Sequence, residues 1–344
     1  MEEDEEGFRY PYLNESECIK CGMCEKVCPA LNEDILKKSF ENGKKFISFA
    51  KSDKDKMKGS SGGIFPLLAE KVIKEKGVVY GAVFDYKNKM VEHIASEQPE
   101  KDGVFRSKYV QSYIGMSYKK VEAQLKKGIP VLFCGTPCQI IGLKMYLEKE
   151  YINLYAIDFR CHGVPSPLIF KEMLALNERK ERSPIINCSF REKDNGWRNQ
   201  FIKLYFQNGS IRFFRSKFHF YYNLFIENYI LRESCYNCDY GNQHLSDITL
   251  ADAWEFSNND TGISEVICNN TKGIEFFKKI SNQVDNIQEC NYDNGSGAST
   301  HDYDIERRRS FFFRYKRFRN HKLLFNYFNV YILSTRIIKK ILKR

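Results

Sequence analysis

Four cysteines near the start of the chain have the spacing of an iron–sulfur ligand run. Residues 18 to 29 read CIKCGMCEKVCP, which places the thiols at Cys18, Cys21, Cys24 and Cys28. Thiolates two residues apart on a tight loop can bind neighbouring irons of one cubane, and Gly22 leaves room for the cluster against the backbone. Zinc sites usually pair separated CxxC turns instead of packing four cysteines so closely. The run therefore predicts a [4Fe-4S] cluster.

The ligand count of this run is incomplete. In this spacing the fourth cysteine normally binds the other cluster of a two-cluster ferredoxin module, and the sequence contains one such run. The preceding segment, GFRYPYLNESEC, resembles the linker between two ferredoxin runs, so one expectation is that an earlier run is missing. The alternative is that another cysteine or a partner protein completes the site.

Further cysteines lie in loops that also contain Gly, Pro or a second Cys. One more [4Fe-4S] site assembled from three loops would use Cys138, Cys161, Cys235 and Cys238. A zinc site with four cysteine ligands is the alternative. The other four thiols are expected to be free core or surface groups: Cys134, Cys188, Cys268 and Cys290.

These loops alternate with apolar runs of strand length and amphipathic runs of helix length. Strands are predicted at 46–50, 78–84, 131–134, 153–159, 247–250 and 263–268, and helices at 64–76, 118–127, 137–149 and 273–284. Asn208-Gly209 predicts a hairpin between strands at 201–206 and 211–214. The order predicts an α/β (mixed α+β) main domain. We expect a ferredoxin-type segment at 1–32, a connector at 33–58, the main domain at 59–300 and a tail at 301–344.

Composition and charge narrow the class of protein. With 42% hydrophobic and 28% charged residues the chain is typical of globular proteins, and it contains no run of about 20 apolar residues that would span a membrane. Residues 307–344 contain thirteen Lys or Arg and no Asp or Glu, so the rest of the chain has a formal charge of −3 within a total of +10. We expect a cytoplasmic protein, in which cysteines serve as metal ligands more often than as disulfides.

The tail has two interpretations. Its basic residues alternate with aromatic ones, and from Val330 onward Ile and Leu recur at helical spacing between Lys and Arg. Peripheral attachment to the inner face of a membrane is the leading hypothesis, and nucleic acid is not the expected partner. The alternative is a helix docked on the main domain.

Six motifs in the main domain occur in the order found in one known family. They are SSGGIF at 60–65, SKYVQS at 107–112, VLFCGTPCQIIGLKMYL at 131–147, DFRCHGVPSP at 158–167, FREKDNGW at 190–197, and RESCYNCDY through SDITLADAW at 232–254. In these motifs the chain resembles the beta subunits of coenzyme F420-reducing hydrogenases and dehydrogenases, including bacterial members encoded among polysaccharide-biosynthesis genes. Ala251 and Leu245 depart from the family pattern, which has Gly and a basic residue there.

The resemblance implies a second cofactor. Members of this family bind FAD and pass electrons between iron–sulfur clusters and a substrate that exchanges hydride at the flavin. On the matching positions, the candidate flavin contacts are Ser61, Gly62, Gly63, Ser107, Lys108, Tyr109 and Gln111. Consecutive Gly and Ser residues before a helix also suit a phosphate, but taken alone they are better explained by a Ser N-cap with flexible glycines.

The expected function follows from the two kinds of cofactor. The sequence predicts an iron–sulfur flavoprotein oxidoreductase or electron-transfer subunit, with a redox partner protein or a small-molecule hydride donor or acceptor. In a bacterium that lacks coenzyme F420, the hydride partner would be a nicotinamide or a nucleotide-sugar intermediate. The alternative is a non-catalytic zinc scaffold that recruits a partner or a membrane through its basic tail.

Overall fold

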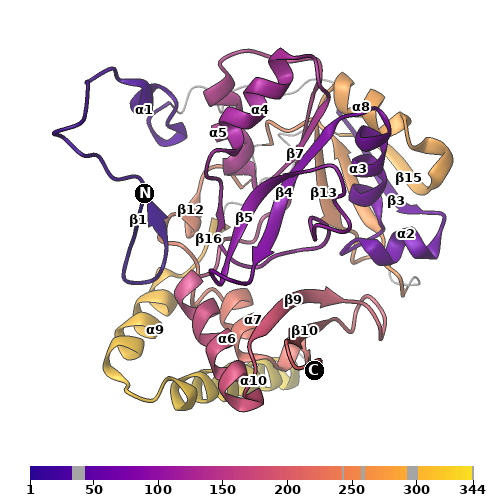
Figure 1. Ribbon diagram of the computed structural model, residues 1–344. Helices are drawn as coiled ribbons and strands as arrows, with labels where there is room; N and C mark the ends of the chain where they lie inside the picture. The colour runs from indigo at the N-terminus through magenta and orange to yellow at the C-terminus, as the bar shows by residue number, and fades with distance from the viewer. Residues whose placement is uncertain (33–42, 242–243, 257–259, 293–300, 343–344) are drawn as a thin grey trace.

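The computed structural model describes residues 1–32, 43–241, 244–256, 260–292 and 301–342. These residues form two lobes, a larger one around a nine-stranded sheet and a smaller one in which helices pack on a three-stranded sheet (Figure 1). The predicted mixed α/β class is confirmed.

The large sheet has a parallel centre, flanked by antiparallel pairs, and the edge strand β6 is parallel to β5. Its strand order is β15 (Val284–Tyr292), β3 (Gly43–Ala50), β14 (Ser264–Cys268), β13 (Ile248–Asp252), β8 (Leu154–Phe159), β7 (Val131–Cys134), β4 (Val78–Asp85), β5 (Met90–Ser96) and β6 (Ser112–Tyr113). The neighbours β13, β8, β7 and β4 are parallel. Their carboxyl ends therefore meet at one edge, where open α/β sheets commonly bind ligands.

Alternating side chains of the central strands bury both faces of this sheet. Val131 and Phe133 of β7 pack against α4 (Ser117–Lys126) and α5 (Pro137–Leu147), whereas Leu132 packs on the other face against α3 (Ile64–Lys74) and α8 (Thr271–Lys278). This alternation follows from the period of two residues along a strand. The predicted helices and strands of this lobe are present, but the helix expected at 273–284 ends at Lys278 and is followed by β15.

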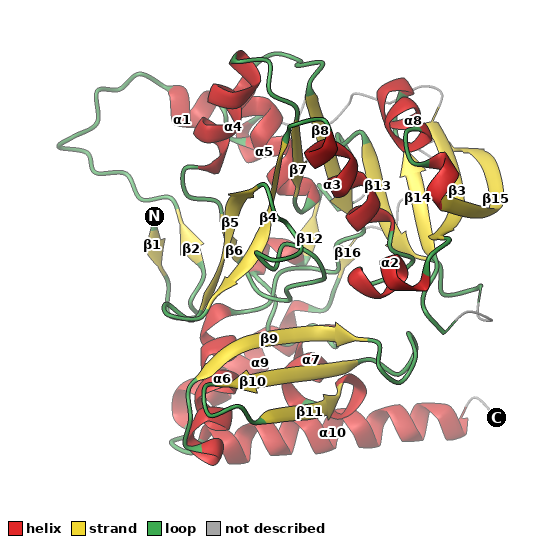
Figure 2. Cartoon of the chain, turned by 45° about the vertical axis from the view of Figure 1, so that its right-hand side comes forward, coloured by secondary structure: helices red, strands yellow, loops and turns green. Residues whose placement is uncertain are grey.

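The smaller lobe contains its own sheet and a second hydrophobic core (Figure 2). The predicted hairpin is β10 (Phe201–Phe206) with β11 (Ile211–Arg215), and β9 (Ile185–Glu192) lies on the other side of β10. At its turn, Gly209 has a φ of 85°, a conformation that glycine adopts without strain. The helices of this lobe are α6 (Pro167–Glu181), α7 (Phe220–Ile226), α9 (Ile305–Arg317) and α10 (His321–Leu342).

The basic tail is docked on this lobe for most of its length. Besides Arg308, its buried residues are Phe311, Phe312, Tyr315, Leu324, Phe325, Phe328 and Ile332, and these seven join the same core as α6 and α7. The docked-helix interpretation is therefore confirmed as far as Arg336, which pairs with Glu227 after α7. Beyond that residue, the end of α10 projects from the lobe (Figure 2).

Short elements complete the described chain. The N-terminal segment contains β1 (Glu2–Glu3), β2 (Arg9–Tyr10), α1 (Met23–Lys26) and the 3-10 helix η1 (Pro29–Leu31). In the segment expected to be a connector, 33–42 lie outside the described residues, and the remainder holds β3 and α2 (Asp53–Lys58). The other short elements are the 3-10 helices η3 (Ser216–Phe218), η4 (Glu233–Cys235) and η5 (Ser281–Gln283), and the paired strands β12 (Asn237–Cys238) and β16 (His301–Asp302).

Candidate functional site

The structure brings together the four main-domain cysteines that the sequence singled out. They line one cavity of about 30 Å³, together with Pro137, Gly163, Val164, Tyr240 and Gly241: Cys138, Cys161, Cys235 and Cys238. We call this group the body cysteine site. It lies at the carboxyl ends of β7 and β8, because Cys138 opens α5 directly after β7 and Cys161 follows β8.

Local backbone features hold these loops in place. Thr136 and Gln139 form a capping box at the start of α5, and the Thr136 hydroxyl lies 3.0 Å from the Cys138 sulfur. Gly163 has a φ of 133°, and a Cβ there would lie 2.9 Å from the Leu231 side chain, so a larger residue would separate the Cys161 loop from the Cys235 loop. The Arg232 N–H donates to the Val164 carbonyl at 2.8 Å, which joins the same two loops.

Burial raises the pKa of all four thiols, which favours their protonated form. Burial, together with the nearby Cys235, Cys138 and Cys238 thiols, raises the pKa of Cys161 well above its ordinary value. Burial likewise raises the pKa of Cys235 to about 12, and it also raises the pKa of Cys138 and of Cys238. Metal binding here must therefore release protons. Within the described ranges, no three His, Cys, Asp or Glu side chains are grouped closely enough to hold a single metal ion.

The N-terminal run lies directly against the helix that carries Cys138. Val27 packs on Ile141 and Met145 of α5, and Lys26 forms an ion pair with Glu148 at 2.7 Å. In the run, Gly22 has a φ of 69° and begins α1, while Cys21 and Cys24 are exposed and Cys18 and Cys28 are partly buried.

Tyr240 lies between the two groups of cysteines. It lines the cavity of the body cysteine site and packs in the same cluster as Val27. Burial raises the pKa of Tyr240 to about 12, and the Cys28, Cys138 and Cys238 thiols are close enough to contribute to this shift. The two groups of cysteines are therefore neighbours, separated by one aromatic side chain.

The first flavin-candidate segment is bonded within the fold. The Ser61 hydroxyl donates to the Ile263 carbonyl at 2.7 Å, and the Gly62 N–H donates to the Ser264 hydroxyl at 2.9 Å. Gly63 precedes α3 with a φ of 83°. A flavin phosphate would have to replace these bonds or bind elsewhere on the loop.

The second flavin-candidate segment meets the first one. The Ser107 N–H donates to the Ser60 hydroxyl at 2.9 Å. Lys108 donates to four carbonyls of its own loop, from Gly103 to Arg106, and burial lowers the pKa of its ammonium group to about 7.

The other two candidates of this segment face different parts of the protein. The Tyr109 carbonyl accepts from the Tyr221 hydroxyl at 2.5 Å. The Gln111 side chain accepts from the Arg9 N–H at 3.0 Å, which attaches the N-terminal segment to the main domain.

Two segments of the chain match known protein families. Residues 130–292 match the C-terminal model of the coenzyme F420 hydrogenase/dehydrogenase beta subunit. This segment belongs to that family. Residues 11–31 match the 4Fe-4S binding domain. Among solved structures, a chain of the F420-reducing [NiFe] hydrogenase complex from Methanosarcina barkeri is similar, with 16% sequence identity and a TM-score of 0.47 over 73% of this chain and 83% of that chain. No curated protein matches the chain.

The two family matches contain all eight proposed metal ligands. The body cysteine site lies within the beta-subunit segment, and the N-terminal run lies within the 4Fe-4S segment. Together they support an iron–sulfur electron-transfer protein of the beta-subunit type. The flavin-candidate residues precede residue 130 and thus lie outside the beta-subunit match. No helix in the described residues is both long and apolar enough to cross a membrane.

One wall of the site was not predicted from the sequence. Tyr303, which follows the beta-subunit segment, packs against the same hydrophobic core as Cys235, and its hydroxyl lies 3.3 Å from Nδ1 of His162. Burial and the nearby Cys161, Cys235 and Cys238 thiols raise the pKa of Tyr303 to about 12. No periodicity or motif marks this tyrosine, because its contact depends on the pairing of β12 with β16, two residues from each strand.

Proposed function

We propose that the chain is an iron–sulfur flavoprotein oxidoreductase or electron-transfer subunit of the beta-subunit type. The observation that carries the proposal is the convergence of Cys138, Cys161, Cys235 and Cys238 on one cavity beside the N-terminal 4Fe-4S segment. The donor set fits a [4Fe-4S] cluster, which would be held by four thiolates from three loops.

In this proposal the residues around the cavity would shield the cluster from water and keep the N-terminal run nearby. A bound cluster supplies one-electron transfer. Pro137 and Val164 line the cavity with apolar surface, which would limit the access of water to the cluster. Tyr240 keeps the N-terminal run next to the body cysteine site, so that electrons would need to travel only a short distance between the two.

We propose FAD as the second cofactor, on the basis of the resemblance in the SSGGIF and SKYVQS motifs. FAD exchanges both hydride and single electrons, which is the chemistry needed to connect clusters with a hydride-exchanging substrate. The two motifs meet at Ser60 and Ser107, next to the candidate Ser61, whereas Tyr109 and Gln111 face other parts of the protein. The hydride partner would be coenzyme F420, a nicotinamide or a nucleotide-sugar intermediate.

Anaerobic purification of the full chain tests the proposal. We expect broad absorption near ~400 nm that bleaches with dithionite, together with iron, acid-labile sulfide and a flavin released by acid. A colourless protein that contains zinc alone would establish the scaffold alternative instead. Iron and sulfide without flavin would retain the iron–sulfur proposal and reject the flavin proposal.

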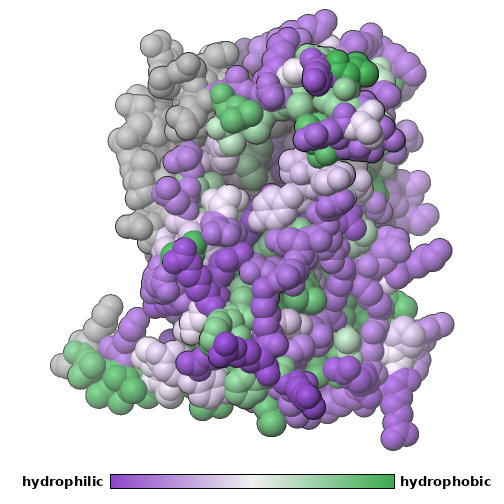
Figure 3. All heavy atoms as spheres, turned by 90° about the vertical axis from the view of Figure 1, so that its left-hand side faces the viewer, coloured by the Kyte–Doolittle hydropathy of each residue, from purple (hydrophilic) through white to green (hydrophobic). Residues whose placement is uncertain are grey.

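We also propose that the projecting end of α10 binds an anionic membrane surface. The exposed fractions of Ile337, Ile338, Ile341 and Leu342 are between 55% and 79%, and Lys339 and Lys340 lie among them. Figure 3 shows this apolar end at the lower left of the molecule. Exposed apolar side chains beside lysines are typical of a helix that lies in the lipid interface.

Co-sedimentation with vesicles of phosphatidylserine and phosphatidylcholine tests this membrane contact. Replacing both Ile337 and Ile341 with serine should weaken binding about tenfold or more, because two apolar anchors on one helix face are lost. Replacing Ile152, which is 87% exposed but lies before β8, should leave binding unchanged. Equal binding by the wild type and both variants would reject the membrane contact, and a protein would then be the partner that binds this end of α10.

A further inference from the structure

The described part of the C-terminal tail, residues 301–342, contains β16, α9 and α10, and we call it the arm. Its start lies against the loop that carries Cys235 and Cys238. β16 pairs with β12 so that His301 is opposite Cys238 in the backbone register. The Tyr303 N–H donates to the Tyr236 carbonyl at 3.3 Å. Residues 301–308 thus lie against this loop and form its outer wall, although they are more than 60 residues away from it in sequence.

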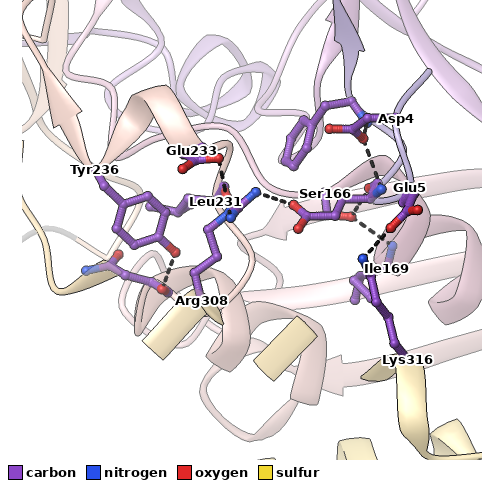
Figure 4. A network of polar contacts seen from close by, with 12 residues as sticks. Asp4, Glu5, Ser166, Ile169, Leu231, Glu233, Tyr236, Arg308 and Lys316 are labelled. Atoms are coloured by element: carbon purple, nitrogen blue, oxygen red, sulfur yellow. Dashed lines mark hydrogen bonds and ion pairs between the residues drawn. The ribbon is translucent and has the colours of Figure 1, made fainter. Parts of the chain in front are cut away.

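Arg308 of α9 connects three segments at this wall (Figure 4). It is buried, and its Nε donates to the Leu231 carbonyl at 3.1 Å. Its guanidinium also pairs with the Glu6 carboxylate of the N-terminal segment and lies 3.7 Å from the Glu233 carboxylate. A planar group with several donors is suited to such a junction, because it can bind a carboxylate and a carbonyl simultaneously.

The groups that Arg308 contacts would be destabilised without it. Burial raises the pKa of Glu6, and the Arg308 guanidinium is the main opposing influence, with Lys316 contributing and Asp4 and Glu233 acting against it. Removing one partner of a buried ion pair leaves an uncompensated charge, and the Leu231 carbonyl would lose its side-chain donor. The loss of these contacts would loosen the segment from Leu231 to Cys235, which contains the hydrogen bond from the Cys235 N–H to the Arg232 carbonyl at 2.9 Å.

We propose that Arg308 is a positioning residue for the body cysteine site, holding the Cys235 and Cys238 loop in the geometry that binds the metal centre. The arm thereby belongs to the metal site as well as to the core of the smaller lobe. The inference rests on the proposed metal site, but its effect on loop geometry exists in the metal-free protein as well.

Thiol alkylation of the full-length, metal-free chain tests the proposal, with the modification of each cysteine followed by mass spectrometry. In Arg308→Met, we expect Cys235 and Cys238 to react about tenfold faster, because the loop opens locally, while Cys18 and Cys21 react as in the wild type. Arg309→Met is the matched control, since Arg309 is exposed on the same helix and pairs with Glu306. Arg309→Met should leave the alkylation rates of Cys235 and Cys238, and of Cys18 and Cys21, as in the wild type.

A second readout separates a positioning role from a general loss of stability. After reconstitution and reduction with dithionite, Arg308→Met should show a weaker or altered electron paramagnetic resonance signal for the cluster at the body cysteine site, and Arg308→Lys, which keeps the charge, should recover part of it. Unchanged reactivity of Cys235 and Cys238, or an equal rise at all cysteines, would overturn the proposal. So would failure of both Arg308 variants to fold, because that result assigns Arg308 to global stability. If the wild type binds no iron and the alkylation result still holds, the proposed function fails while the positioning role of Arg308 stands.

Discussion

Replacing Cys161 with serine should remove the iron bound at the body cysteine site and leave the N-terminal run unaffected. Cys161 lines the cavity close to the other three cysteines, whose thiols all contribute to its raised pKa. A cluster that loses one of four thiolates is expected to be lost or to become labile. Iron and acid-labile sulfide per chain should fall by about half if each site holds one cluster.

Cys134→Ser provides the control for this experiment. Cys134 ends β7 close to the site in sequence, but it does not line the cavity and packs with the core beneath α3. Its replacement should leave iron and sulfide within the error of the wild-type measurement. Equal iron content in the Cys161 variant and the wild type would contradict the assignment of the body cysteine site.

The second large effect concerns stability. Replacing Arg191 with methionine should lower the free energy of unfolding by about 3–5 kcal/mol, because it leaves the Asp252 carboxylate without its buried partner. Arg191 of β9 donates to both oxygens of Asp252 in β13, at 2.8 and 3.1 Å, and so connects the small sheet to the large one. Burial lowers the pKa of the Arg191 guanidinium, but Tyr109 and Asp252 outweigh it and raise the pKa overall.

Denaturant unfolding followed by circular dichroism measures this effect. Arg212→Met is the matched control, because Arg212 pairs with Glu181 at 2.7 Å in a more exposed position and should cost no more than about 1 kcal/mol. Replacing Arg191 with methionine and Asp252 with leucine together should recover part of the loss, since no buried charge then remains unpaired. Equal losses in the two single arginine variants would show that the pair does not join the lobes.

Much of the large sheet could be predicted because local signals agree with the fold. Thr136, Pro137 and Gln139 mark the start of α5, and the apolar run before them is β7. The four main-domain cysteines could be grouped because each lies in a loop with Gly, Pro or a second Cys. Val284 was predicted to end a helix, but it begins β15, since pairing with β3 decides its conformation.

The rest depended on contacts between distant segments, which leave no periodic pattern. Arg308 is one of three consecutive arginines, and nothing in the sequence distinguishes the buried one from its exposed neighbour Arg309. Gln111 belonged to a proposed flavin motif, yet its side chain bonds to the backbone of Arg9. Contacts of this kind, between residues far apart in the sequence, can be identified only from the three-dimensional structure.

The two helices of the arm also have a mechanical consequence. Glu227 binds Arg307 of α9 at 3.3 Å and Arg336 of α10 at 2.9 Å, and Asn223 bonds to Asn329 at 2.6 Å. Because both arginines bind the Glu227 carboxylate, the start of α9 and the last turns of α10 are braced together against the end of α7. A load applied to the projecting end of α10 would therefore reach Arg307 through Glu227, and from there the neighbouring Arg308 and the backbone that carries Cys235.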